Sequence, residues 1–340
     1  MTRAGRDRRA PAASPADRFG LAEVERAAAR IAGRVHRTPV LGSRLLDQEV
    51  GCRVLLKAEH LQRGGAFKAR GAFNALLALD AATRARGVIA VSSGNHAQAV
   101  ALAAAETGSR AVVVVPADAN PAKVAASRAY GARVVQEGVT PETREAVVAA
   151  LAADLGLHLV HPFDDLDVMA GQGTAALELV EQASDLDLVL VPVGGGGLAA
   201  GTAAAVKGRS PATRVVGVEP ATAADAQASL RAGRRVALPA APVTIADGVR
   251  ALALGERPFA VLRRLLDDVV TVTDAELRDA LVFAWSRTKQ LVEPSAALPL
   301  AALLTGRAGG GRVGVVVSGG NVDAAALAAG LAGPGGGGVR

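Results

Sequence analysis

Several residue types are scarce in this chain, and each shortage excludes a class of protein. Aromatic residues make up only 2% of the 340 residues, so the net charge of +6 is not accompanied by the stacking side chains that nucleic-acid-binding proteins use. A single cysteine, Cys52, excludes an internal disulfide and favours a reducing compartment such as the cytoplasm. No apolar run reaches the ~18 residues of a membrane span. We therefore expect a soluble protein that binds neither nucleic acid nor membrane.

Lysine is also scarce, because only five of the 38 basic residues are lysines, and one of them has an unusual context. Lys68 follows Gly64, Gly65, Ala66 and Phe67 and precedes an apolar, helix-like run. A lysine amine in a confined, partly apolar place loses solvation of its charged form, so its pKa falls and it becomes nucleophilic. Such a lysine suits Schiff-base chemistry with a carbonyl cofactor. The alternative is a loop lysine beside a glycine turn.

Short β-branched runs alternate with longer helical segments along the chain. We expect strands at 88–91, 111–115, 133–135, 186–191, 214–218 and 312–317, and helices at 97–106, 141–155 and 174–182. This alternation predicts an α/β fold with parallel sheets covered by helices on both faces. In such sheets, ligands bind at the carboxyl ends of strands, often where a glycine loop opens a helix.

Two turns between an expected strand and an expected helix have the composition of ligand-binding loops. One is Ser92-Ser93-Gly94-Asn95-His96, an N-capping turn suited to a carboxylate, or else a plain helix cap. The other consists of four glycines that precede Leu198: Gly194, Gly195, Gly196 and Gly197. Glycines allow close backbone approach, and a helix N-terminus favours a phosphate. Their spacing, with Glu219 at the end of the next strand, also fits a loose dinucleotide pattern, but a nicotinamide-dependent dehydrogenase leaves Lys68 unexplained.

Together these segments resemble those of the threonine/serine dehydratase and serine racemase family, which uses pyridoxal 5'-phosphate (PLP) on the fold-type II scaffold. The resemblance covers roughly residues 20 to 330, and the matching segments follow in the family's order: 59–74, 92–96, 170–174, 194–197, 244–248, 293–295 and 318–321. It implies two open twisted parallel-sheet α/β domains with the cofactor in the cleft between them.

The family's layout implies boundaries for these domains. A large PLP-binding domain is expected at 19–80 plus 161–332, and a small inserted domain at 81–160. The basic leader 1–18 and the glycine-rich tail 333–340 are expected to be disordered. No regulatory module is expected after Asn321, which favours a catabolic enzyme.

The resemblance also implies roles for the candidate residues. Lys68 binds PLP covalently and then acts as the general base, while Phe67 packs on the cofactor ring. Asn95 contacts the ring hydroxyl, and the four glycines with Leu198 hold the phosphate. The substrate-binding residues are Ser92, Ser93, Asn95, His96 and Arg144. Ser93 is also the residue that could return a proton on the opposite ring face, as in racemisation. Arg144 could bind a second substrate carboxylate, or be an ordinary solvated helical arginine.

Ser318 and an acidic loop complete the site that the resemblance implies. Ser318 faces the pyridine nitrogen, where an aspartate would keep that nitrogen protonated. A hydroxyl can donate to a neutral nitrogen, so the electron sink is weaker and elimination is favoured over transamination. Glu219, Ala223 (through its carbonyl) and Asp225 match a divalent-cation site suited to Mg²⁺ or Ca²⁺, or else an ordinary acidic loop.

We therefore expect a homodimeric PLP-dependent ammonia-lyase that β-eliminates water from a small hydroxy amino acid, L-threonine or L-serine, to give a 2-oxo acid and ammonia. Serine racemase and threo-3-hydroxyaspartate dehydratase are alternatives on the same scaffold. A nicotinamide-dependent dehydrogenase and a non-catalytic PLP-binding protein are alternatives of other classes. One departure affects the substrate: Ala66 stands where many members have Ser, and Gly64 where they have Thr. Alanine at this place also occurs in members that act on 3-hydroxyaspartate.

Overall fold

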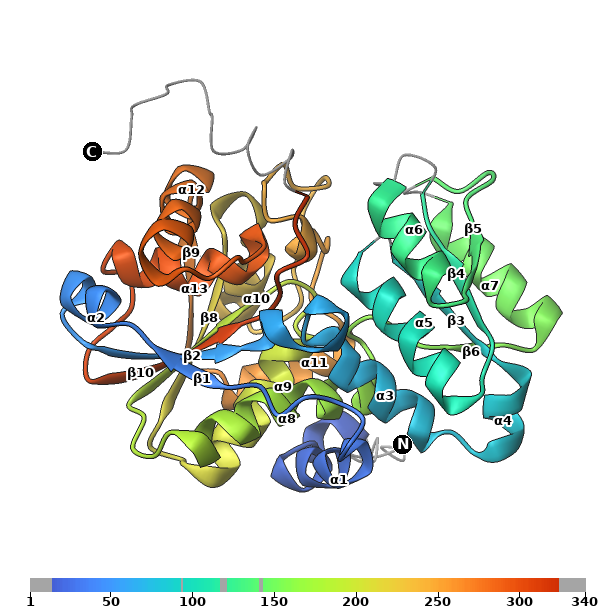
Figure 1. Ribbon diagram of the computed structural model, residues 1–340, viewed down its shortest axis with the longest axis horizontal. Helices are drawn as coiled ribbons and strands as arrows, with labels where there is room; N and C mark the ends of the chain where they lie inside the picture. Colours follow the sequence, from blue (N-terminus) through green and yellow to red (C-terminus); the bar gives the residue numbers. More distant parts are fainter. Residues whose placement is uncertain (1–13, 93, 117–120, 141–142, 324–340) are drawn as a thin grey trace, which may run out of the picture.

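The computed structural model describes residues 14–92, 94–116, 121–140 and 143–323, which form two α/β lobes side by side (Figure 1). The larger lobe contains a six-stranded sheet in the order β1-β2-β10-β7-β8-β9, and the smaller lobe a four-stranded sheet in the order β5-β4-β3-β6. Neighbouring strands run parallel except β1 and β2, which are antiparallel. The expected α/β fold class with parallel sheets is confirmed.

The strands are β1 (Val40–Gly42), β2 (Arg53–Ala58), β3 (Val88–Val91), β4 (Ala111–Val114), β5 (Arg133–Val135), β6 (His158–Leu159), β7 (Leu188–Pro192), β8 (Arg214–Pro220), β9 (Asp268–Val272) and β10 (Arg312–Val317). The α-helices are α1 (Leu21–Ile31), α2 (Arg44–Val50), α3 (Lys68–Ala78), α4 (Ala81–Arg86), α5 (Asn95–Thr107), α6 (Pro121–Ala129), α7 (Arg144–Leu155), α8 (Leu166–Gln182), α9 (Gly197–Arg209), α10 (Asp225–Ala232), α11 (Glu256–Leu265), α12 (Asp274–Phe283) and α13 (Pro294–Leu304). Short 3-10 turns are η1 (Pro15–Arg18), η2 (Glu59–Leu61), η3 (Arg63–Gly65), η4 (Ala221–Ala223) and η5 (Asp247–Val249), and η6 (Ala284–Thr288) is a π-helical turn.

All six expected strands are present, but the sequence patterns missed β1, β2, β6 and β9. The helix expected at 174–182 begins earlier, at Leu166, because the Asp165 side chain accepts hydrogen bonds from the backbone N–H groups of Asp167 and Val168 and caps it. The end of the expected leader also differs, since Pro15–Arg18 form a turn with Ala16 buried. Residues 1–13 and 333–340 lie outside the described residues.

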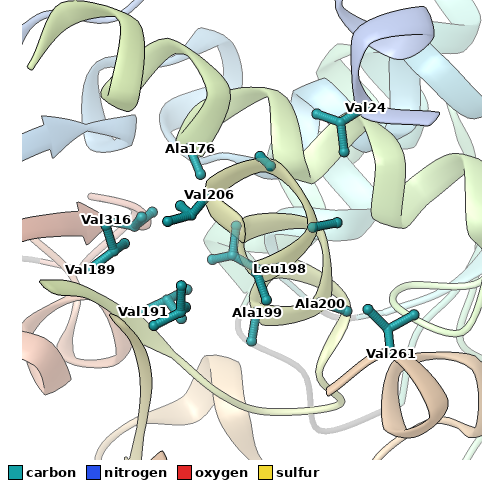
Figure 2. Close-up of a cluster of buried hydrophobic side chains, with 14 of the residues drawn as sticks. Val24, Ala176, Val189, Val191, Leu198, Ala199, Ala200, Val206, Val261 and Val316 are labelled. Atoms are coloured by element: carbon teal, nitrogen blue, oxygen red, sulfur yellow. The ribbon is translucent and has the colours of Figure 1, made fainter. Parts of the chain in front are cut away.

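Both faces of the large sheet are apolar and covered by helices, as a parallel sheet requires. Val189 and Val191 of β7 face the side covered by α8 and α9, while Leu188 and Leu190 face the side covered by α12 and α13. Figure 2 shows the first of these cores, with helix α9 surrounded by side chains of the sheet, α8, α1 and α11. Within the described part of the chain, no helix is both long and apolar enough to cross a membrane.

Helix α8 crosses α3 and α9 at glycines. A Cβ on Gly171 would lie 2.6 Å from Cα of Gly71 in α3, and a Cβ on Gly173 would lie 2.6 Å from the carbonyl oxygen of Gly201 in α9. These helices therefore pack backbone against backbone. Helix α3 begins with Lys68 and α9 begins with Gly197. The crossings therefore hold the N-terminal ends of both helices against α8.

We expect Gly201→Ala to lower the free energy of unfolding by about 1–3 kcal/mol, because the added methyl overlaps the Met169 carbonyl and the Gly173 backbone. Helix propensity alone predicts the opposite sign, a gain of about 1 kcal/mol. Urea denaturation would measure the change. Ala105→Ser, at an exposed position of α5, is the control and should change stability by less than about 0.5 kcal/mol. A stabilised Gly201→Ala protein would contradict the close crossing.

Candidate functional site

Lys68 is the first residue of α3, and it is partly buried. Its Nζ donates a hydrogen bond to the carbonyl oxygen of Pro162 (2.7 Å) and lies 5.0 Å from the centroid of the Phe67 ring. Burial lowers the pKa of Lys68 to about 8, although the carboxylate of Glu293 acts in the opposite direction. The surroundings of Lys68 are therefore those of a confined lysine with a lowered pKa.

The segment before Lys68 is tied to the end of β10. Gly64 and Gly65 adopt left-handed backbone conformations (φ +68° and +72°), which favour glycine. Phe67 N–H donates to the carbonyl of Ser318 (2.9 Å), and Gly320 N–H donates to the carbonyl of Gly65 (2.9 Å). Ser318, buried at the end of β10, therefore lies beside the lysine segment.

The four glycines connect β7 to α9 and leave no room for side chains. A Cβ on Gly195 would overlap the ring of Phe163, and one on Gly194 would lie 3.0 Å from Cα of Val249. Gly196, with φ +91°, directly precedes the first residue of α9. The free N–H groups at this helix start form a cradle suited to a phosphate.

The segment that separates the glycine loop from Lys68 was missed by the sequence patterns. Pro162 accepts the hydrogen bond of Lys68, and the neighbouring Phe163 packs on the loop. His161 stacks edge-on against Phe163 (4.6 Å between centroids), and its Nδ1 accepts from the backbone N–H of Asp164 (2.8 Å). Lys68 and the glycine loop therefore both contact this segment, Lys68 through Pro162 and the loop through Phe163.

Asn95 lies in the first turn of α5, so it is not part of a capping turn before the helix as expected. Its Nδ2 donates to both carboxylate oxygens of Glu293 (2.9 and 3.0 Å), and its Oδ1 accepts from Nδ2 of Asn321 (3.0 Å). Glu293 directly precedes α13 of the larger lobe, and its contact with Asn95 joins it to α5 of the smaller lobe (Figure 1). The side chains of Glu293 and Asn321 are therefore further members of the site that sequence analysis did not assign.

Ser92, Ser93 and His96 are the other candidate residues of the segment 92–96. Ser92 Oγ accepts from the N–H of Gly94 (3.1 Å), whereas Ser93 lies outside the described residues. His96 is buried with Nε2 at 2.9 Å from the carbonyl of Val160, and burial lowers its pKa to about 3. The His96 side chain is therefore held as a neutral group by the carbonyl of Val160, and its expected contact with substrate stays a prediction.

Arg144 and Leu198 lie at the starts of their helices. Leu198 follows the first residue of α9 and is buried in the core of the large lobe.

Arg144 is the first residue of α7 and is partly buried, and its guanidinium has no hydrogen-bonding partner among the described residues. Burial lowers the pKa of His161, and nearby carboxylates, among them that of Glu145, act in the opposite direction.

Glu219 and Asp225 are two buried carboxylates at the end of β8 and the start of α10, with buried Ala223 between them in the chain. Burial raises the pKa of Glu219 to about 8, and proximity to Asp225 adds to the shift. Burial also raises the pKa of Asp225 to about 6, and its Oδ2 has no hydrogen-bonding partner in the described part of the chain. Among the described residues there is no cluster of three His, Cys, Asp or Glu suited to a metal, so a cation here would need backbone oxygen or water as well.

Residues 31–319 match the family model described as pyridoxal-phosphate dependent enzyme. The chain belongs to this family. It is 48% identical over 303 residues to the L-threo-3-hydroxyaspartate ammonia-lyase of a Pseudomonas species, an alignment that covers 88% of this chain and 95% of the relative.

Two solved structures are similar in fold to this PLP-dependent enzyme. The crystal structure of a threonine deaminase from T.th. has 53% identity and a TM-score of 0.86, and the match covers 89% of this chain and 99% of that one. The structure of maize serine racemase has 40% identity and a TM-score of 0.88, and the match covers 92% and 96%. The expected family and its fold-type II architecture are confirmed.

The residues present fit PLP. The family's cofactor needs an amine and a phosphate cradle, and here a lysine with a lowered pKa and a glycine loop at a helix start both contact the segment of Pro162 and Phe163. The dinucleotide interpretation of this loop is wrong, because the chain belongs to the pyridoxal-phosphate family. The Glu219 carboxylate accepts from the N–H groups of Ala226 and Gln227 at the start of α10.

We expect the rate at which the PLP-free enzyme captures PLP covalently to follow the neutral fraction of Lys68. Because the pKa is about 8, the rate should rise about tenfold per pH unit below pH 8 and level off above it. Borohydride trapping at pH 6 to 9.5, followed by mass measurement, would test this. A rate that still rises tenfold between pH 8.5 and 9.5 would indicate an ordinary lysine, and Lys68→Ala is the control for capture at other lysines.

Proposed function

We propose that the enzyme eliminates water from a 3-hydroxy amino acid, L-threonine or L-serine, and releases a 2-oxo acid and ammonia. The observation that carries this proposal is the Lys68 amine, whose lowered pKa and hydrogen bond to Pro162, the neighbour of the residue that packs on the glycine loop, suit a general base. PLP, when bound, supplies the electron sink that makes the α-proton of the amino acid acidic.

Lys68 has two successive tasks in this reaction. With PLP bound, the Lys68 amine would hold the cofactor covalently, and once released by the substrate amine it would take the α-proton. The bond from the β-carbon to its hydroxyl breaks, and the hydroxyl leaves with a proton as water. The released enamine is hydrolysed to the 2-oxo acid and ammonia.

The surrounding residues hold the cofactor and the substrate. The loop of Gly194, Gly195, Gly196 and Gly197, followed by Leu198, would hold the phosphate through backbone N–H groups. Phe67 would pack on the ring, Ser318 would donate to the pyridine nitrogen, and Asn95, which Glu293 orients, would contact the ring hydroxyl. A hydroxyl at Ser318 supports elimination, because it does not keep the ring nitrogen protonated.

L-threo-3-Hydroxyaspartate is a second candidate substrate. The partly buried guanidinium of Arg144, without a described partner at the start of α7, is suited to a second carboxylate. Ala66 also favours this substrate, because many family members have a serine hydroxyl at this position, two residues before the lysine, and alanine occurs in members that act on 3-hydroxyaspartate. The relative named for this activity in Pseudomonas is 48% identical.

Racemisation of serine is a third candidate reaction on the same scaffold, favoured by the 40% identity to maize serine racemase. It requires a proton donor on the opposite ring face, for which Ser93 is the candidate. We further propose, from the family resemblance, that the enzyme is a homodimer and acts in the cytoplasm.

We expect purified enzyme with PLP to release 2-oxo acid from L-threonine, L-serine or L-threo-3-hydroxyaspartate, and Lys68→Ala to lose at least about 10³-fold in rate. A coupled 2-oxo acid assay on these substrates and D-serine would rank them. Arg144→Gln should raise KM for hydroxyaspartate and leave threonine unchanged if Arg144 binds the second carboxylate. No release from any substrate would refute the lyase proposal.

We also propose that Glu219, the Ala223 carbonyl and Asp225 bind a divalent cation. Mg²⁺ or Ca²⁺ at about 100 times its Kd should then stabilise the folded enzyme by about 2.7 kcal/mol, measured as a higher melting temperature. Asp225→Asn should abolish this effect, and Asp279→Asn, on the exposed side of α12, should keep it. An equal shift in the enzyme and the Asp225 variant would place the cation elsewhere.

A further inference from the structure

Three buried charged side chains and a partly buried one form a cluster at the start of α3. Lys57, Glu59 and Arg70 are fully buried, and Glu178 of α8 is 14% exposed. The two positive and two negative charges balance. Because residues two apart on a helix point in directions that differ by ~200°, Arg70 projects away from Lys68 into this cluster.

Arg70 is the centre of the cluster. Its Nε and Nη2 donate to the two carboxylate oxygens of Glu59 (2.7 and 2.8 Å), while Nη1 and Nη2 donate to those of Glu178 (2.7 and 2.9 Å). Two-point pairing of a guanidinium with a carboxylate fixes orientation as well as distance. Burial opposes ionisation of Glu59, but the Arg70 guanidinium holds its pKa below the usual value.

The pair between Arg70 and Glu59 closes a loop that contains Lys68. Glu59 directly follows β2 and Arg70 is the third residue of α3, so the pair joins the two ends of the segment that carries the glycine turn, Phe67 and Lys68. The middle of the same segment is held to β10 by the Phe67–Ser318 backbone bond. Arg70 also fastens this turn of α3 to α8 through Glu178, next to the glycine crossing.

We propose that Arg70 is a positioning residue, whose double ion pair to Glu59 and Glu178 holds the first turn of α3 so that the Lys68 amine meets its reaction partners in productive geometry. Arg70 acts through the helix and not by contact with the amine. The inference rests on the proposed role of Lys68. Displacement of a reacting group by about 1 Å can cost about 10²-fold in rate.

Lys57 provides a matched control within the same cluster. Its Nζ donates to the carbonyl of Thr38 (2.7 Å), Glu178 (2.6 Å) and Gln182 (2.8 Å), so it joins β2 to α8 without contacting α3. Lys57→Met and Arg70→Met each remove one buried positive charge and leave the same net charge. Only the second opens the loop around Lys68.

The experiment compares Arg70→Met, Lys57→Met and the charge-balanced double variant Arg70→Met/Glu59→Gln. The double variant keeps the Lys57–Glu178 pair, so it remains informative if Arg70→Met does not fold. Thermal unfolding, steady-state release of 2-oxo acid, and borohydride-trapped capture of PLP from pH 6 to 9.5 are measured for each. Capture uses no substrate and so does not depend on the lyase reaction.

We expect both Arg70 variants to lower kcat by about 10- to 100-fold with little change in KM, and to move the pH midpoint of PLP capture upward. Lys57→Met should stay within about threefold in kcat and keep the midpoint, even with an equal loss of thermal stability. Equal effects of Lys57→Met and the Arg70 variants, or loss of stability alone, would overturn the proposal. If wild-type enzyme captures PLP but releases no 2-oxo acid, the lyase function fails and the capture midpoints alone decide the role of Arg70.

Discussion

Helix α8 has glycines where it crosses α3 and α9, and the geometry of the candidate site follows from these crossings. Gly171 meets Gly71 of α3, and Gly173 meets Gly201 of α9, at backbone-to-backbone distance. The two crossing helices begin with Lys68 and with the last of the four glycines. The lysine and the loop are therefore related by rigid backbone contacts rather than by flexible side chains. Such a scaffold suits a reaction in which one amine must reach a cofactor whose phosphate is fixed elsewhere.

The first turn of α3 also separates two kinds of positive charge. Arg70 points into a dry cluster where two carboxylates keep it charged, and burial without such partners would be very costly. Lys68, on the other side of the same turn, has no carboxylate in hydrogen-bonding contact with its Nζ among the described residues, and burial lowers its pKa. Glu293 is the carboxylate that acts on it at longer range, and it is engaged by Asn95. The pKa is therefore lowered at Lys68 and raised at Arg70, although the two residues are only two positions apart.

Local patterns in the sequence were sufficient for much of the fold and for part of the site. The six strands with uninterrupted β-branched runs were predicted, because both faces of such strands are apolar. Strand β2 was missed, since Lys57 interrupts its apolar run and is buried only because Glu178, 121 residues away, pairs with it. The lysine and the glycine loop could be found from their neighbours in sequence. The pairing of Asn95 with Glu293 spans 198 residues, and no local pattern predicts it.

The similarity of this scaffold to a threonine deaminase and a serine racemase indicates where the choice of reaction must lie. With Lys68 as the proposed general base, the crossings of α8 and the glycine loop would serve any of these reactions equally, because each begins with removal of the same α-proton. Discrimination then depends on groups that meet the rest of the substrate. Ala66, paired with Gly319 in a backbone bridge, carries no hydroxyl two residues before the lysine. Arg144 offers a positive charge from the smaller lobe that no described residue pairs. A second carboxylate would be attracted by Arg144, whereas the methyl group of threonine gains nothing from it, so this one side chain can separate the two substrates.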